Sequence, residues 1–317
     1  MEQIDYTAPS MKKRSGFAYT LRYMRRYYQL YLLILPALAS VIIFNYWPLY
    51  GIQIAFKDFR PGLGFTGSEW VGFEHFLRFF KIPTFYTLIK NTVGISLYGL
   101  IAGFPIPIFL AFMINEVRSR KFKKTVQMIT YAPYFLSTIV VCGMLLLFLK
   151  KDTGVINAIV ALFGGERQDF ILKPQYFWSI YVWSGIWQGA GWGTIIYLAA
   201  LSSVSQETVE AAIIDGCNRF QKIIHVDWPA IVPTIIILLI LSFGSLVGVG
   251  YEKVLLLQTS LNMDAADVLS TYTYRQGILG GQYDYTTAIG LLNSIVNAIL
   301  LVAVNTLARK TGETSLF

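Results

Sequence analysis

Residues 176–201 read YFWSIYVWSGIWQGAGWGTIIYLAAL and contain no Asp, Glu, Lys or Arg. A helix of about 20 such residues crosses the hydrocarbon core of a bilayer. The chain of 317 residues is 55% hydrophobic and 14% charged, with a mean hydropathy of +0.53. Soluble domains are usually about a quarter charged. The chain is therefore predicted to be an all-α integral membrane protein.

Comparable stretches recur along the chain and predict six transmembrane helices. They are residues 28–50, 86–114, 125–149, 176–201, 230–250 and 285–308. Lys90 is the only charged side chain in them, and near a span end its ammonium can reach the membrane surface. A charge at mid-bilayer costs roughly 2.5–3.5 kcal/mol on insertion scales, which accounts for this composition. A soluble protein with a large buried helical core is the alternative.

The positions of the 26 Lys and Arg residues predict the orientation. Most of them lie before residue 28 and in the connections after every second span, which places both termini in the cytoplasm. The predicted organisation is a cytoplasmic segment 1–27, a six-helix domain 28–308 with a cytoplasmic loop 202–229, and a cytoplasmic tail 309–317. The basic amino terminus resembles a signal peptide. Because the apolar run continues through Val41–Phe44, it is predicted to be an uncleaved first span.

Two other compositional features exclude function classes. The formal net charge is +8, but the basic residues flank the spans instead of forming one patch, so no nucleic-acid partner is predicted. Cys142 and Cys217 are too few and too far apart for a disulfide framework or a metal site.

The loop between the fourth and fifth spans has a pattern of its own. Ser203 and Gln206 fit a capping box and predict the start of a short helix. Glu207 and Glu210 fall on one face of that helix, and Gly216 can end it in a left-handed conformation. A second short helix is predicted to reach Pro229. The loop is then a small helix–turn–helix with paired acids at its tip, and a generic amphipathic connector is the alternative.

The same loop resembles a known family. Glu210–Ala212 is followed after three residues by Gly216, and nine residues later by Val226–Pro229. This spacing resembles the EAA loop of binding-protein-dependent ABC importer permeases. The family usually has Leu where Trp228 stands and often Pro where Ser205 stands. The resemblance implies a type I ABC importer permease fold.

Further stretches resemble the maltose-type branch that transports complex carbohydrates and polysaccharide fragments. They are Leu35–Pro36, Tyr46–Phe59, Trp70–Phe73, Asn91–Thr92, Tyr131–Pro133 and Asp267–Arg275. The resemblance implies a bacterial cytoplasmic-membrane subunit that is not itself an enzyme and binds no cofactor directly. The implied partners are a second, distinct permease, an ATPase dimer that binds ATP and Mg, a solute-binding protein, membrane lipid and an oligosaccharide.

The resemblance also implies which loop residues couple transport to the ATPase. They are Glu207, Glu210, Ala211, Ala212, Asp215 and Gly216. Glu210 would pair with a basic group of the ATPase, while Ala211 and Ala212 would allow close packing. Gly216 would make the turn and Asp215 would cap or brace it.

Candidate solute-pathway residues follow from sugar chemistry. Sugars bind to aromatic faces and to side chains that both donate and accept hydrogen bonds. The candidates within the spans are Asn91, Tyr181, Trp183, Trp187, Gln188, Trp192, Asn293 and Asn297. The alternative is structural, because Trp and Tyr collect at membrane surfaces and Asn can join helices.

Other transport and enzyme classes fit less well. An ion-coupled secondary transporter needs carboxylates or His inside the membrane, whereas His75 and His225 lie in predicted loops. The sequence has no His-Glu-x-x-His, Gly-x-Ser-x-Gly or Walker-type phosphate loop. A passive channel leaves the loop at Glu210 unexplained. A permease for a non-sugar solute stays open as the second possibility.

Overall fold

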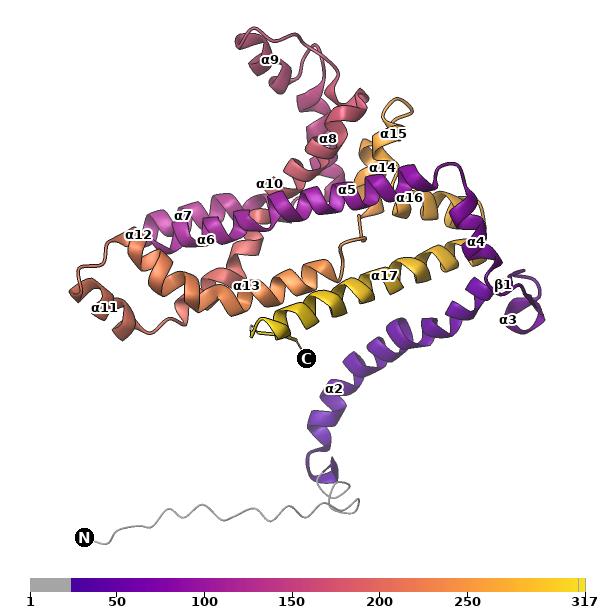
Figure 1. The fold of residues 1–317 in the computed structure, drawn as a ribbon, viewed down its shortest axis with the longest axis horizontal. Helices are drawn as coiled ribbons and strands as arrows, with labels where there is room; N and C mark the ends of the chain where they lie inside the picture. Colours follow the sequence, from indigo (N-terminus) through magenta and orange to yellow (C-terminus); the bar gives the residue numbers. More distant parts are fainter. Residues whose placement is uncertain (1–23, 313, 317) are drawn as a thin grey trace. The chain divides into compact units, whose positions relative to one another are not determined.

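The computed structural model describes residues 24–312 and 314–316 (Figure 1). Residues 1–23 of the predicted segment 1–27, and residues 313 and 317 of the predicted tail, lie outside the described residues. Residues 1–53 and 54–317 form two units, which are considered separately. The elements, with η marking 3-10 and π segments, are α2 (Tyr28–Val41), η1 (Ile42–Tyr46), η2 (Trp47–Phe56), β1 (Lys57–Asp58), α3 (Gly64–Gly67), β2 (Glu69–Trp70), α4 (Glu74–Lys81), α5 (Phe85–Gly103), α6 (Pro105–Asn115), α7 (Arg120–Tyr131), η3 (Ala132–Phe135), α8 (Thr138–Leu149), α9 (Val155–Leu162), η4 (Phe170–Leu172), α10 (Pro174–Ser202), α11 (Gln206–Ile214), α12 (Arg219–Lys222), η5 (Ile223–Asp227), α13 (Trp228–Phe243), α14 (Tyr251–Leu257), α15 (Met263–Ala266), α16 (Leu269–Thr273), η6 (Tyr274–Leu279) and α17 (Tyr283–Lys310).

The helices include several that can cross a membrane. Within the described residues, four helical runs are long and apolar enough, and a bent pair would make a fifth. The four are Tyr28–Phe56, Phe85–Asn115, Arg219–Phe243 and Tyr283–Lys310. Helix α10 has 29 residues, but its Trp, Tyr, Gly and Ser side chains make it less apolar. The described part of the chain is thus mostly helical, with four or five candidate spans where six are predicted.

The third predicted span, residues 125–149, is wrong as a single helix. Its two halves, Arg120–Phe135 and Thr138–Leu149, are bent by 98° at a short break. Pro133 lacks a backbone N–H, and Leu136 is extended with ψ 136°. The Ser137 hydroxyl then accepts a hydrogen bond from Val140 N (3.4 Å) and starts α8. Figure 1 shows α8 and α9 leaving the line of α7.

The fifth predicted span, residues 230–250, is misplaced along the chain. Its helix starts earlier, at Arg219, and ends at Phe243, so residues 244–250 lie outside it. A Cβ on Gly244 would lie 2.4 Å from the Leu301 side chain, which shows how closely α13 approaches α17 there. Beyond it, Val247 N donates to Asn297 Oδ1 (3.0 Å). The glycine-rich end of this segment therefore forms turns that α17 holds in place.

Helix α10 is the centre of the helical bundle in the second unit. It packs against α5, α6, α7 and α13, and α13 packs against α17 (Figure 1). Towards one end, buried Phe177 and Val182 of α10 meet Ile95 of α5. Towards the other, buried Tyr197 and Leu201 form a second cluster with α6 and α13.

The connection between the first and second spans is folded. Strands β1 and β2 pair antiparallel, with Lys57 opposite Trp70. The imidazole Nε2 of His75 lies 2.9 Å from Lys57 O, and Phe59 N donates to Asp284 Oδ2 at the start of α17 (3.1 Å). The small sheet is thereby fixed to one end of the bundle.

Candidate functional site

The predicted loop helix is present as α11, but its capping was predicted wrongly. The helix begins at Gln206 with Ser205 as N-cap, two residues later than a Ser203 cap requires. The Ser203 hydroxyl donates instead to Ala200 O (2.7 Å). The reason is that α10 continues to Ser202, so Ser203 belongs to the end of the preceding span.

Gly216 makes the turn as predicted. Its φ is +81°. Any residue with a Cβ would be less stable in this left-handed conformation, whereas glycine adopts it readily. Asp215 is the C-cap residue, Gly216 N donates to Ile213 O and Cys217 N donates to Ala212 O, each at 3.0 Å. These two bonds satisfy the last carbonyls of α11 in a Schellman arrangement. Asp215 lies at the turn, and its carboxylate accepts no hydrogen bond from the described residues.

Helix α11 presents both acidic and apolar side chains to its surroundings. Glu207 and Glu210 are exposed, and Gln206 Nε2 donates to Glu210 Oε1 (2.8 Å). Ala211 is exposed and Ala212 is half-buried. A further apolar edge is formed by Ile213 and Ile214, which are 60% and 85% exposed. A solvent-facing connector does not need this apolar edge, whereas a helix that docks on another protein does.

The second part of the loop does not end at Pro229, contrary to the prediction. The Asn218 side chain accepts from Gln221 N and Asn218 N donates to the Gln221 side chain, both at 2.9 Å, which starts α12. The chain then continues through the π turn η5 into α13. Pro229 lies in the first turn of α13, where a missing N–H is tolerated. The second part of the loop and the fifth span therefore form one continuous helical piece, Arg219–Phe243.

An ion network that the sequence did not reveal joins this piece to the end of α6. The ammonium of Lys222 donates to Glu116 and lies 3.0 Å from Asp227 Oδ2. The Asp227 side chain is only 2% exposed, so its charge depends on this partner. Glu116 follows α6 and is far from Lys222 in sequence, so no local pattern could have predicted the contact.

The aromatic candidates of α10 do not form a single site. Trp192 stacks on Tyr134 with ring centroids 4.6 Å apart, and Trp183 Nε1 donates to the Tyr98 hydroxyl (2.8 Å). Trp183 and Trp187 are about half exposed and line cavities other than the one that Tyr181 lines.

Gln188 lies at the break in the third span. Its Nε2 donates to Leu136 O (2.9 Å), the carbonyl that the break between α7 and α8 leaves without a helical partner. This contact is a structural role for a residue predicted to bind solute.

The three candidate asparagines also lie apart. Asn91 is 1% exposed and donates to the carbonyls of Asp264 and Asp267, both at 2.9 Å. Asn297 accepts from Val247 N, as described above. Asn293 borders an apolar cavity of about 310 Å³, and its buried Oδ1 has no partner among the described residues. For Asn91 and Asn297 the geometry favours the helix-joining alternative.

Two sequence motifs that are distant along the chain meet at Asn91. Next to it, Thr92 Oγ1 accepts from Leu269 N (2.8 Å). The Asp267–Arg275 stretch closes on itself, because Arg275 donates to both carboxylate oxygens of Asp267 at 2.9 and 2.6 Å. Such a bidentate pair is among the stronger ionic contacts. The motif residues thus hold α16 against α5.

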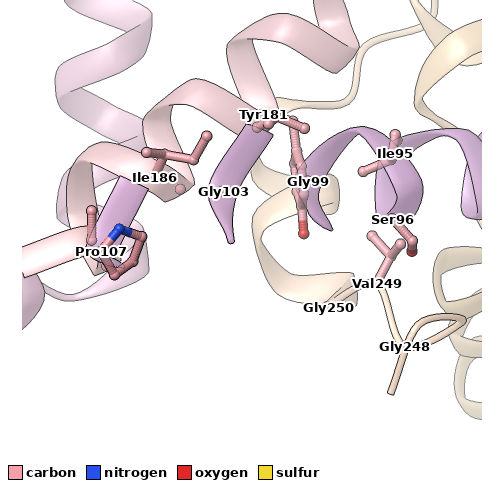
Figure 2. Close-up of a pocket in the computed structure, with 14 residues that line it drawn as sticks. Ile95, Ser96, Gly99, Gly103, Pro107, Tyr181, Ile186, Gly248, Val249 and Gly250 are labelled. Atoms are coloured by element: carbon pink, nitrogen blue, oxygen red, sulfur yellow. The ribbon is translucent and has the colours of Figure 1, made fainter. Parts of the chain in front are cut away.

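A cavity of about 440 Å³ lies between α5, α10 and the segment after α13 (Figure 2). It is lined by Ile95, Ser96, Gly99, Gly103, Pro107, Tyr181, Val182, Gly185, Ile186, Gly189, Ala190, Gly248, Val249 and Gly250. A Cβ on Gly99, Gly189 or Gly250 would meet nothing within 4 Å. Backbone therefore forms much of the wall, and Tyr181 is the only aromatic residue among the described residues that line it.

Lys253 of α14 lies at the edge of this cavity and was missed in the sequence. Its ammonium donates to Tyr181 O (2.8 Å) and lies 4.7 Å from the centre of the Tyr181 ring. A Cβ on Gly185, another lining residue, would lie 3.3 Å from the same nitrogen. The available signal was its position, three residues after a glycine-rich apolar stretch.

Comparison with known proteins identifies the family to which these features belong. Residues 103–312 match the family described as binding-protein-dependent transport system inner membrane component. The chain belongs to this family. It is therefore a transport subunit and a multi-pass protein of the bacterial inner membrane.

Relatives of this permease match it over nearly their whole length. It is 43% identical to protein LplB of Bacillus subtilis, over 98% of this chain and 97% of the relative. It is also 43% identical to the polygalacturonan/rhamnogalacturonan transport system permease protein YteP of the same organism, over 91% and 90% of the two chains. A chain of a solved bacterial ABC transporter for the acidic polysaccharide alginate superposes with a TM-score of 0.83 at 39% identity, covering 92% and 99%. This likeness confirms the ABC importer permease fold.

Proposed function

We propose that this chain is the six-span permease subunit of an ATP-driven importer for oligosaccharides or polysaccharide fragments. The relatives support a saccharide, because YteP is named for polygalacturonan and rhamnogalacturonan, and AraP of Bacillus subtilis, 29% identical, for arabinooligosaccharides. The observation that carries the transport role is α11, a helix with exposed acids and apolar residues that the Gly216 turn joins to the helix of the fifth span.

The six proposed spans correspond to the six long apolar segments of the sequence. The bent pair α7 and α8 supplies the third, and α10 supplies the fourth, in addition to the four long apolar helices. Both termini and loop 202–229 lie in the cytoplasm by the distribution of Lys and Arg. The functional domain extends over residues 28–308.

In the proposed mechanism α11 docks in a cleft of an ATPase subunit. The ATPase dimer, and not this chain, binds ATP and Mg, and its ATP-driven closure moves the two permease subunits from an inward-open to an outward-open state. Glu207 and Glu210 face basic groups, Ala211 and Ala212 permit close approach, and Asp215 with Gly216 fixes the turn. A second, distinct permease completes the pathway, and a solute-binding protein delivers the saccharide from outside. Movement passes through α12 into α13, and through Lys222 to Glu116 at α6.

A second candidate solute class rests on more distant relatives. The chain is 24% identical to the sn-glycerol-3-phosphate transport system permease protein UgpA of Escherichia coli, over 79% of its length. The higher identities to saccharide permeases favour the saccharide. Ion coupling gains no support from Asp227, although it lies in the helix of the fifth span, because Lys222 already neutralises it.

The test is ATP-driven uptake by the complete complex in proteoliposomes, with radiolabelled oligosaccharide on the binding-protein side. We expect Glu210→Ala to reduce uptake at least about tenfold, since a charged hydrogen bond contributes roughly 1.5–3 kcal/mol. Glu166→Ala is the matched control, because Glu166 is exposed in the connection on the opposite side of the membrane. Normal uptake by Glu210→Ala would reject the coupling role, and uptake without an ATPase would reject the importer.

A further inference from the structure

We infer that Lys253 and Tyr181 form a subsite for the carboxylate of an acidic sugar, so that the permease carries oligosaccharides containing uronic acid. This inference rests on the proposed function and adds the charge of the substrate to it.

The first step is the position of the ammonium. Lys253 Nζ is held at the cavity wall by the carbonyl of Tyr181 and by the face of the Tyr181 ring. It also lies against the backbone of Gly185. Both Tyr181 and Gly185 line the cavity, which Figure 2 shows between α5, α10 and Gly248–Gly250. The ammonium is therefore in contact with two residues that line this space, and an anion bound at its edge would lie next to the charge.

The second step is the absence of a carboxylate partner. Two other cations of the same unit, Lys222 and Arg275, each contact one or more carboxylates. Lys253 forms no ion pair with any residue in the described part of the chain, although its side chain is half-buried. A partly desolvated cation without an anion is unfavourable, and a bound carboxylate relieves that cost. The site is thus poised for a negative charge.

The third step is the kind of anion. A sugar presents hydroxyl groups that both donate and accept hydrogen bonds, and uronic acids add a carboxylate at the ring edge. Tyr181, which lines the cavity (Figure 2), offers its hydroxyl, and Lys253, whose ammonium lies over the ring of Tyr181, offers the charge. The glycine wall leaves room for the ring, since Gly99, Gly189 and Gly250 have open space in front of them. A cavity of about 440 Å³ is within the usual range for small-ligand sites.

The carboxylate could instead come from an acidic side chain of the second permease. The two sources make different predictions for neutral sugars. A protein carboxylate would make Lys253 equally important for every substrate, whereas a substrate carboxylate makes it important only for acidic ones.

The experiment compares trigalacturonate with its neutral methyl ester on the purified complete complex. Binding of each labelled saccharide to the complex is measured directly, and ATP-driven uptake is measured in proteoliposomes with saturating binding protein. The variants are Lys253→Met, Lys253→Arg and, as a matched control, Lys151→Met, which removes an exposed lysine of another connection.

We expect Lys253→Met to weaken trigalacturonate binding and uptake at least tenfold while the methyl ester changes less than twofold. Lys253→Arg should retain most of the activity towards the acid, and Lys151→Met all of it. Equal losses for both saccharides, no loss for either, or no binding of trigalacturonate by the unchanged complex would each overturn the inference. The proposed function is judged separately, because it fails only if the unchanged complex shows no ATP-driven uptake of any oligosaccharide.

Discussion

The ammonium of Lys222 lies 3.0 Å from the buried carboxylate of Asp227 and also contacts Glu116. Asp227 belongs to the π turn between α12 and α13, and Glu116 follows α6. One side chain therefore connects the loop helices to two membrane-spanning helices. A displacement of α12 by a partner must either carry the end of α6 with it or break this contact.

Replacing Lys222 tests that connection. Lys222→Met leaves the Asp227 carboxylate buried without a cation, and we expect it to destabilise the protein by about 3 kcal/mol. Thermal unfolding in detergent measures the effect. The double variant Lys222→Met/Asp227→Asn removes the uncompensated charge and should recover at least half of the loss. A single variant that unfolds at the temperature of the unchanged protein would show that the network contributes nothing.

Gly216 offers a test of the loop turn. Proline fixes φ near −65°, whereas the turn requires +81°, so Gly216→Pro should abolish uptake although the spans still insert. Gly216→Ala adds only the cost of a left-handed residue, about 1–2 kcal/mol, and should reduce uptake partially. Uptake and the amount of protein in the membrane are measured together. Full uptake by the proline variant would contradict the role of this turn.

Replacing Asn91 distinguishes a structural role of this residue from a role in binding solute. Asn91→Leu removes two hydrogen bonds and leaves the Asp264 and Asp267 carbonyls unsatisfied, so we expect a loss of about 2 kcal/mol in stability. The variant protein that remains folded should transport saccharide with an unchanged KM. A raised KM with unchanged thermal stability would instead restore Asn91 to the solute pathway.

Gln188 is expected to stabilise the break in the third span. Gln188→Leu leaves the Leu136 carbonyl without its donor and should cost about 1 kcal/mol. Trp187→Leu, a change at the neighbouring exposed position, serves as the control for lost bulk in α10. Thermal unfolding of both variants gives the comparison, and an unaltered Gln188→Leu protein would show that the break is maintained by other contacts.

Composition and local patterns predicted those parts of the fold that depend on short stretches of chain. Apolar segments of span length identified the membrane helices, and the spacing from Glu210 to Gly216 located the loop helix and its left-handed turn. Both properties are local, because a bilayer selects each apolar helix individually and a turn is defined by neighbouring φ and ψ angles.

The failures arose where tertiary contacts decide. The third span breaks at Leu136, where Gln188 on another helix supplies a donor for the freed carbonyl. The fifth span ends at Phe243, where α17 approaches Gly244 and Asn297 accepts a hydrogen bond from Val247 N. Likewise, Lys253 becomes notable only when the structure shows that it forms no ion pair with the described residues, and a list of residue types cannot show that.

Gly99 is a position in the cavity wall where the size of the side chain can be varied. A Cβ at that position would have no neighbouring atom within 4 Å. Replacing Gly99 by alanine, valine and leucine in turn would therefore reduce the cavity volume in steps. The smallest substitution that blocks uptake of each saccharide would then rank the saccharides by cross-section. Substitutions at this glycine would thus measure the size limit for transported saccharides.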